Sequence, residues 1–76
     1  MNTVEMARHE KMMYLRGIDD CDEKIGAIMD GIRAVHATGD AYRMRLQCAK
    51  LARWIKRRKR YMVCRDRAER AEKNVD

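Results

Sequence analysis

The sequence predicts an all-α protein in which two long helices fold back on each other as an antiparallel hairpin. Three observations indicate this fold class. Apolar residues recur at alternating intervals of three and four residues. No segment shows the strict alternation of apolar and polar residues that is typical of a half-buried strand. The one strong turn signal lies in the middle of the chain. Intervals of three and four place side chains on one face of an α-helix. We expect a single coiled-coil-like domain over residues 1–76, with a helix at about 4–37, a turn at 38–40 and a helix at about 41–73.

The first half of the chain carries a long and regular apolar face. Ten positions follow the alternating spacing without interruption, and nine of them are apolar: Val4, Ala7, Lys11, Tyr14, Ile18, Cys21, Ile25, Ile28, Ile32 and Val35. Glycines inside a helix each cost about 1 kcal/mol relative to alanine, but the spacing keeps its phase through Gly17, Gly26 and Gly31. We therefore expect one helix, with any bend near Gly17. The alternative is a break there, with Asp19 capping a second helix.

The turn and the second helix follow from residues 37–40, Ala-Thr-Gly-Asp. Gly39 suits the left-handed position that ends a helix, and Asp40 suits the position that caps the next one. A turn this short makes the two helices antiparallel neighbours. The expected contact face of the second helix is Met44, Cys48, Leu51, Ile55, Arg58 and Met62.

The charges give an independent expectation for the register of the hairpin. If the turn centres between Thr38 and Gly39, residue i lies opposite residue 77 − i. Ile28 then lies beside Cys48, one residue from its exact counterpart Ala49, and Lys11 lies opposite Asp66. The acidic run 19–23 lies opposite residues 54–58, which include Arg58. The register therefore pairs opposite charges that the apolar pattern did not require.

Charge is distributed very unevenly between the two halves of the chain. Residues 1–39 carry five Lys or Arg and seven Asp or Glu, whereas residues 40–76 carry thirteen and five. Six of the eight residues from 53 to 60 are basic. An asymmetry of this size points to an anionic partner for the second half.

At about 100° per residue, several of these cations project away from the first helix and form a stripe roughly 25 Å long, at 1.5 Å rise per residue. The candidate binding residues are Lys50, Arg53, Trp54, Lys56, Arg57, Arg60, Tyr61 and Arg67. Cations bordered by aromatic rings suit phosphate contact with base stacking. Three interpretations stay open: a nucleic-acid site, a site for an acidic protein surface, and a solvated face in which the two rings only pack.

A second apolar surface borders the first helix. This methionine flank comprises Met6, Met13, Gly17, Ala27 and Gly31, which are flexible or small residues. A lone hairpin of this size is marginally stable. We expect the flank to form a homodimer that completes a four-helix bundle, or to dock on a foreign protein.

Several classes of protein and site do not fit this sequence. It has no phosphate loop, no Ser/His/Asp set and no metal-ligand spacing, so we expect no enzyme, no catalytic residue, no cofactor, no metal and no small-molecule substrate. Three cysteines without a C-x-x-C pair indicate free thiols. No apolar run approaches the roughly 18 residues of a membrane span. We therefore expect a cytoplasmic protein without membrane contact.

In size and expected shape the chain resembles the small dimeric helical-hairpin RNA binders of plasmid copy control. It shares no motif with them, so no residue role is carried over. The expected function is a non-enzymatic regulator or adaptor that binds nucleic acid through the basic face of the second helix. The alternative is an inhibitor or adaptor of the phage or mobile-element type, which blocks a host protein through its helical surface.

Overall fold

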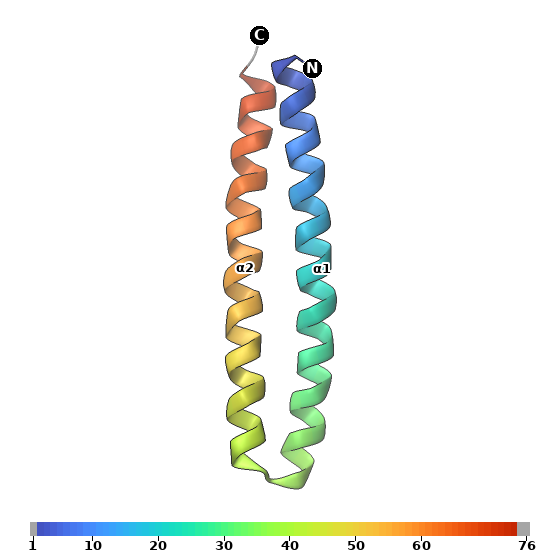
Figure 1. Ribbon diagram of the computed structural model, residues 1–76, viewed down its shortest axis with the longest axis vertical. Coiled ribbons are helices and arrows are strands. Elements are labelled where there is room, and N and C mark those ends of the chain that lie inside the picture. The colour runs from blue at the N-terminus through green and yellow to red at the C-terminus, as the bar shows by residue number, and fades with distance from the viewer. Residues whose placement is uncertain (1, 75–76) are drawn as a thin grey trace.

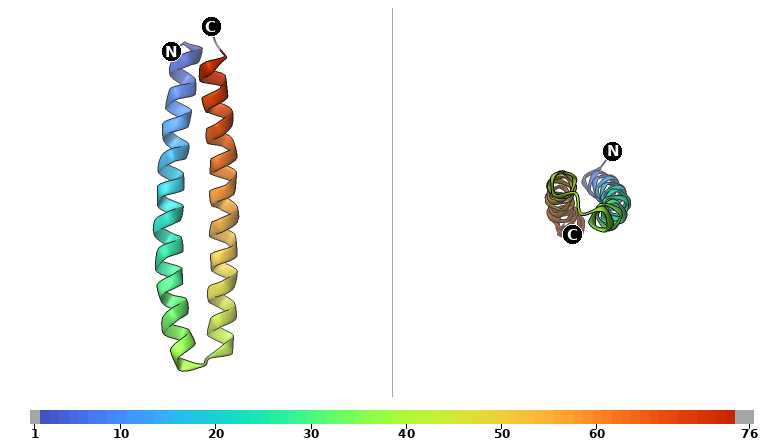
Figure 2. Two further views of the ribbon diagram at one scale, coloured as in Figure 1. Left: turned by 180° about the vertical axis from the view of Figure 1, so that it is seen from behind. Right: turned by 90° about the horizontal axis from the view of Figure 1, so that it is seen from below.

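The protein is an antiparallel pair of helices, α1 at Thr3–Thr38 and α2 at Ala41–Lys73, in a computed structural model that describes residues 2–74. The helices lie side by side along their whole length, and both ends of the chain are at the same end of the hairpin (Figure 1). The rod measures 57 × 14 × 14 Å between Cα atoms. Views from behind and along the axis show the same two-helix arrangement (Figure 2). The all-α prediction is confirmed for the described residues.

The helix ends are set by local hydrogen bonds of the expected kind. The Asn2 side chain accepts a hydrogen bond from the Glu5 amide at 2.8 Å and so caps α1. Gly39 adopts the left-handed conformation, with φ 71°, and its N–H bonds back to the Val35 and His36 carbonyls. Asp40 accepts from the Arg43 amide at 3.1 Å and starts α2. Only Gly39 and Asp40 lie between the helices, so the connection that reverses the chain is two residues long.

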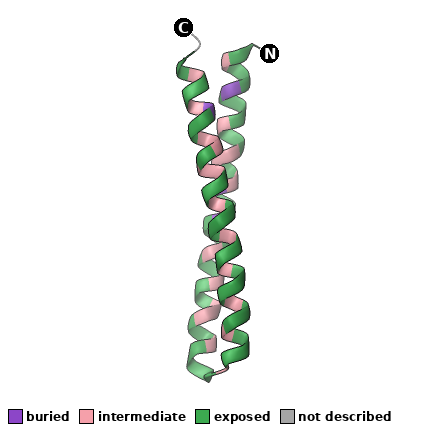
Figure 3. Ribbon diagram, turned by 90° about the vertical axis from the view of Figure 1, so that its left-hand side faces the viewer, coloured by how far each residue is buried: buried purple, intermediate pink, exposed green. Residues whose placement is uncertain are grey.

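Helix α1 presents the predicted apolar face to α2. All ten positions of the 3-4 pattern are buried or half-buried, and three of them, Ala7, Ile18 and Cys21, are fully buried. Figure 3 shows this less exposed band where the helices meet. The helix runs unbroken through Gly17, so the alternative break at that residue is wrong. The fully buried residues also include Ala68 in α2. Ala7, Ile18 and Ala68 lie in the half of the rod away from the turn, and Cys21 lies at its middle.

The contact face of α2 differs from the one expected. Cys48 is exposed and Ile55 is 39% exposed, so both lie outside the helix–helix contact. Less exposed residues recur instead with the opposite alternation: Met44, Gln47, Leu51, Trp54, Arg58, Tyr61, Arg65, Ala68 and Glu72. The face turns this way because it covers the large rings of Trp54 and Tyr61, which the expected face would have left in water.

The register is displaced as a consequence. Gly17 faces Tyr61 and Gly31 faces Gln47, each one residue further along α2 than the 77 − i rule expects. The Asp22–Arg58 and Arg8–Glu72 ion pairs lie three residues further. The expectation that Arg58 reaches the acidic run is confirmed. The expected pairing of Ile28 with Cys48 is wrong, because Cys48 faces solvent.

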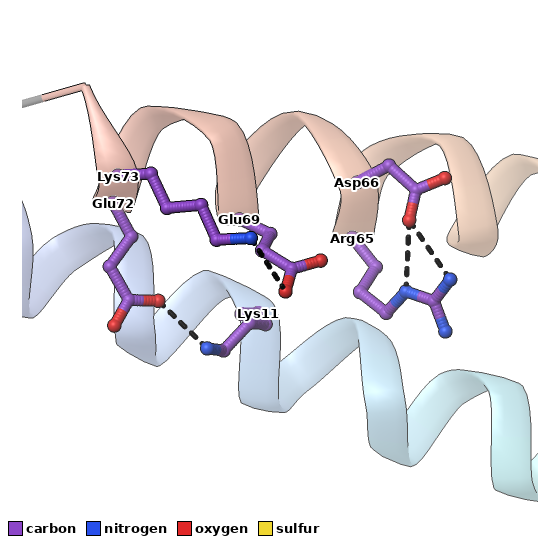
Figure 4. Close-up of polar contacts among 6 residues, drawn as sticks. All are labelled: Lys11, Arg65, Asp66, Glu69, Glu72 and Lys73. Carbon is purple, nitrogen blue, oxygen red and sulfur yellow. Dashed lines mark hydrogen bonds and ion pairs between the residues drawn. The ribbon is translucent and has the colours of Figure 1, made fainter.

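The expected pair Lys11–Asp66 is also wrong. Lys11 Nζ lies 2.7 Å from the Glu72 carboxylate, whereas Asp66 accepts hydrogen bonds from the adjacent Arg65 (Figure 4). Arg8 Nε contacts the other oxygen of Glu72 at 2.9 Å. Hydrogen bonds from Lys11 and then Arg8 lower the pKa of Glu72. Two cations of α1 and one carboxylate of α2 therefore join the helices near their open end.

Neither of the two helices contains an apolar stretch of the length and low charge that crossing a bilayer requires.

Candidate nucleic-acid interface

Helix α2 carries most of the positive charge of the molecule, and little of it is neutralised. Four of its cations form ion pairs: Arg43 with Asp40, Arg58 with Asp22, Arg65 with Asp66 and Lys73 with Glu69. Within residues 2–74, the others have no carboxylate within 4.0 Å: Arg45, Lys50, Arg53, Lys56, Arg57, Lys59, Arg60, Arg67 and Arg70. Among the ion pairs of residues 2–74, only Arg58–Asp22 and the two contacts of Glu72, with Arg8 and Lys11, cross between the helices. The acidic run of α1 therefore leaves the outer face of α2 positive.

Four of the unpaired cations converge on one shallow depression. Arg53, Lys56, Arg57 and Arg60 line it, and no other residue does. We call these four residues the basic hollow. They come together because i, i+3, i+4 and i+7 positions share one side of a helix. All four are exposed and no carboxylate lines the depression, so it is suited to a polyanion.

The remaining predicted cations lie outside the basic hollow. Lys50 and Arg67 are exposed on the same helix. Arg67 lines a different depression, together with Glu10, Tyr14 and Cys64. The structure therefore divides the predicted stripe into a four-residue centre and outlying charges on either side of it.

The two predicted aromatic residues, Trp54 and Tyr61, are half-buried in the helix–helix contact. Tyr61 lies over Gly17, where an added Cβ would be 3.0 Å from its ring, and its ring centroid is 6.3 Å from that of Tyr14. A glycine is thus needed opposite the tyrosine ring for this close approach. Neither ring lines the basic hollow; both line a separate cavity between the helices, which they share with Arg57.

Arg57 connects the rings to the basic hollow. Its guanidinium carbon lies 5.2 Å from the Trp54 ring centroid and 5.9 Å from that of Tyr61, which is within the range of cation–π attraction. Its Nε donates a long hydrogen bond of 3.4 Å to the Tyr61 hydroxyl. That hydrogen bond raises the pKa of Arg57 above its ordinary value. Arg57 is therefore an oriented cation.

Sequence reasoning missed this role of the aromatic pair. The signal was present, because Trp54 and Tyr61 stand three residues before and four residues after Arg57. Residues at these spacings are neighbours on a helix surface. The second signal is that Gly17 lies opposite Tyr61, and it could be recognised only with the correct register of the two helices.

Helix α2 covers part of the methionine flank. Met6 and Met13 are 51% and 55% exposed, and Ala27 is exposed. Gly17 and Gly31 are instead covered by the side chains of Tyr61 and Gln47 from the same chain. The room that these glycines create is therefore filled within the hairpin. An interface at Met6, Met13 and Ala27 stays a prediction.

No group of three or more His, Cys, Asp or Glu side chains among residues 2–74 is placed to hold a metal ion. The three cysteines are free thiols, with Cys21 buried, Cys64 half-buried and Cys48 exposed.

Comparison with protein-family models, with curated proteins and with solved structures gives no match for this chain.

Proposed function

We propose that this chain is a non-enzymatic regulatory or adaptor protein that binds nucleic acid through α2. The observation that carries the proposal is the basic hollow, which is lined by Arg53, Lys56, Arg57 and Arg60 alone. None of these four cations has a carboxylate partner among the described residues. The free thiols support a reducing compartment, the cytoplasm.

Phosphate contact suits this surface better than base reading. Duplex DNA carries one negative charge per roughly 1.7 Å of axis, and its neutralisation by Lys and Arg supplies affinity without sequence preference. The hollow offers cations at four positions over about two helical turns, with Lys50 and Arg67 beyond its ends. Reading of base edges relies on side chains such as Asn and Gln as well as Arg, and none of the residues that line the hollow is an amide.

Fluorescence anisotropy of a labelled duplex over a range of salt concentrations tests the proposal. Each phosphate contact steepens the log–log salt dependence by about 0.9, so a four-contact hollow predicts a slope of about −3 to −4. Replacing Arg53 and Arg60 together with Gln should reduce the slope by about two. The matched control replaces Arg16 and Arg33 of α1 with Gln, which removes the same charge and should leave the slope unchanged. Absence of binding at about 50 mM salt would overturn the proposal.

The same proposal includes a homodimer in which two hairpins complete a four-helix bundle. Only four described residues are fully buried, whereas eight large apolar side chains are exposed: Met6, Met12, Met13, Met29, Tyr42, Leu46, Ile55 and Val63. A core this small is marginal alone. Sedimentation should give a dimer mass, and dilution should lower Tm. A monomer mass with a concentration-independent Tm would exclude the bundle.

The exposed methionines favour a second candidate, an inhibitor or adaptor of the phage or mobile-element type that binds a host protein. Met6, Met12 and Met13 are each about half exposed near one end of α1. Methionine side chains adapt to varied apolar surfaces. A protein partner of this kind predicts capture that resists nuclease treatment and is abolished by Met13→Glu. Capture lost on nuclease treatment would favour the nucleic-acid function.

A further inference from the structure

The guanidinium of Arg57 is only partly used by its intramolecular contacts. Its Nε donates to the Tyr61 hydroxyl, and its plane is attracted to the rings of Trp54 and Tyr61. Its two terminal nitrogens form no hydrogen bond or ion pair with any described residue. Arg57 lines the basic hollow and, with Trp54 and Tyr61, also a cavity between the helices that includes Asp20 and Glu23. Neither carboxylate forms an ion pair with Arg57, so both donors can still bond to an anion in the hollow.

The orientation of Arg57 is imposed by packing between the helices. Tyr61 is fixed over Gly17 and beside Tyr14, both of which belong to α1. Trp54 is half-buried in the same contact. Arg53, Lys56 and Arg60, by contrast, have no ion pair or aromatic contact among residues 2–74 and are exposed. Contacts that favour one orientation therefore exist for one cation of the hollow before any ligand arrives, whereas the other three cations have no such contacts.

The same contacts limit what the rings can do for a nucleic acid. Stacking on Trp54 or Tyr61 requires an open ring face. The guanidinium of Arg57 stands over both rings. A base could reach either ring from this side only by displacing the arginine. Single-strand recognition by base stacking is therefore disfavoured.

We propose that Arg57 is the preorganised phosphate-binding residue of the basic hollow, that Trp54 and Tyr61 position it, and that the ligand is the phosphate backbone of a duplex in preference to unpaired bases. This inference rests on the proposed function. The planar fork of an arginine can hold one phosphate through two parallel N–H···O hydrogen bonds, which a lysine cannot do. Preorganisation adds affinity because less side-chain freedom is lost on binding.

Anisotropy measured with a labelled 20-base-pair duplex, and with each of its strands alone, tests the inference at about 50 mM salt, where phosphate contacts are strong. Arg57→Lys keeps the charge and should weaken duplex binding about 3- to 10-fold, because the preorganised fork is lost. The salt slope should not change. The matched control Arg53→Lys lies in the same hollow without ring contacts and should weaken binding by less than about twofold.

Tyr61→Phe tests the positioning role, because it removes the hydroxyl and keeps the ring over Gly17. It should weaken duplex binding in the native protein and have no further effect in the Arg57→Lys background. A purely structural role would lower Tm and give equal effects in both backgrounds. Tyr42→Phe, at a tyrosine that is 71% exposed, is the control and should change neither binding nor Tm.

The outcomes separate the two proposals. If the native protein binds neither the duplex nor the strands, the proposed function itself fails. If the duplex binds but Arg57→Lys and Arg53→Lys weaken it equally, Arg57 is one charge among four and the inference is overturned. Tighter binding of the single strands than of the duplex would also overturn it, because the rings would then have to be open to bases.

Discussion

Helices α1 and α2 have similar lengths, 36 and 33 residues, but they distribute their polar residues in different ways. Of the ten contact positions of α1, only Lys11 is polar. Of the nine recurring contact positions of α2, four are polar: Gln47, Arg58, Arg65 and Glu72. Helix α1 thus supplies most of the apolar surface that holds the hairpin together, and α2 supplies most of the charge.

This difference separates stability from binding. Helix α2 has a weak apolar face and a dense array of like charges, which repel one another. It is held as an ordered helix by packing against α1. Substitutions on the contact face of α1 should therefore change the free energy of unfolding. If the proposed function holds, substitutions on the outer face of α2 should change nucleic-acid affinity in a protein that still folds.

Thiol reactivity gives the largest expected contrast between the helices. Cys21 of α1 is fully buried, and this burial raises the pKa of its thiol, whereas Cys48 of α2 is exposed. Cys21 should react only through opening of the hairpin, at least about 100-fold more slowly than Cys48. Labelling with a thiol reagent and mass spectrometry of the fragments measures both rates. Protection of Cys48 in dilute protein would contradict the contact face of α2.

Truncation of one isoleucine in each helix should give the next largest contrast. Ile18→Ala removes a buried side chain of α1 and should lower the free energy of unfolding by about 2–4 kcal/mol. Ile55→Ala, at a partly exposed position of α2, should lower it by less than about 1 kcal/mol. Urea denaturation followed by circular dichroism measures both. Equal losses of unfolding free energy for the two variants would indicate that Ile55 does lie in the helix–helix contact.

The two glycines Gly17 and Gly26 form a matched pair within α1. A Cβ at residue 26 would meet nothing within 4 Å, so Gly26→Ala should stabilise the protein by about 0.5–1 kcal/mol. A Cβ at residue 17 would approach three atoms of the Tyr61 ring at 3.0–3.1 Å. Gly17→Ala should therefore leave the protein about 1–2 kcal/mol less stable than Gly26→Ala. Equal stabilisation by both substitutions would contradict the position of the tyrosine ring.

The smallest expected effect concerns the ion pairs at the open end. Glu72→Gln should lower Tm at neutral pH, and Glu69→Gln, which affects a contact within α2 only, should lower it less. Because the pKa of Glu72 is lowered in the folded state, the stabilisation is fully present above the ordinary value of about 4.3. It is lost as the pH falls through the lower folded-state pKa. A difference in Tm that persists in strong acid would exclude the carboxylate as its source.

The regular features of the fold were predictable from sequence, whereas the register was not. All ten contact positions of α1 and both capping residues at the turn follow from the spacing of residue types. The expected α2 face is wrong at Cys48 and Ile55, because Trp54 and Tyr61 stand within a basic segment where their sequence spacing fits both base stacking and packing. The position of the Tyr61 ring depends on Gly17, which is more than forty residues away in sequence. The spacing of residue types within one helix does not show where a glycine in the other helix leaves room for a large ring.

The candidate site, like the fold, was predictable from the sequence only in part. The sequence identified the exposed cations of α2 because most charged side chains lie on the solvent side of a helix, although Arg58 and Arg65 lie in the helix–helix contact. It did not show that Arg53, Lys56, Arg57 and Arg60 share one depression or that Arg57 is held against two rings. Those features depend on side-chain geometry across the helix–helix contact.

The position of the buried residues has a consequence for folding cooperativity. Val35 and Met44 lie beside the turn and meet when a loop of about ten residues closes, but they are only half-buried. Ala7 and Ala68, which are fully buried, lie about sixty residues apart in the chain. Closing the longer loop costs about 1.5 kcal/mol more chain entropy.

A chain that has paired only near the turn has therefore lost entropy without forming its best-packed contacts. We therefore expect such a half-paired hairpin to be much less stable than the native one. The rod should consequently form and separate in one concerted transition, in contrast to a hairpin that opens gradually from its free ends.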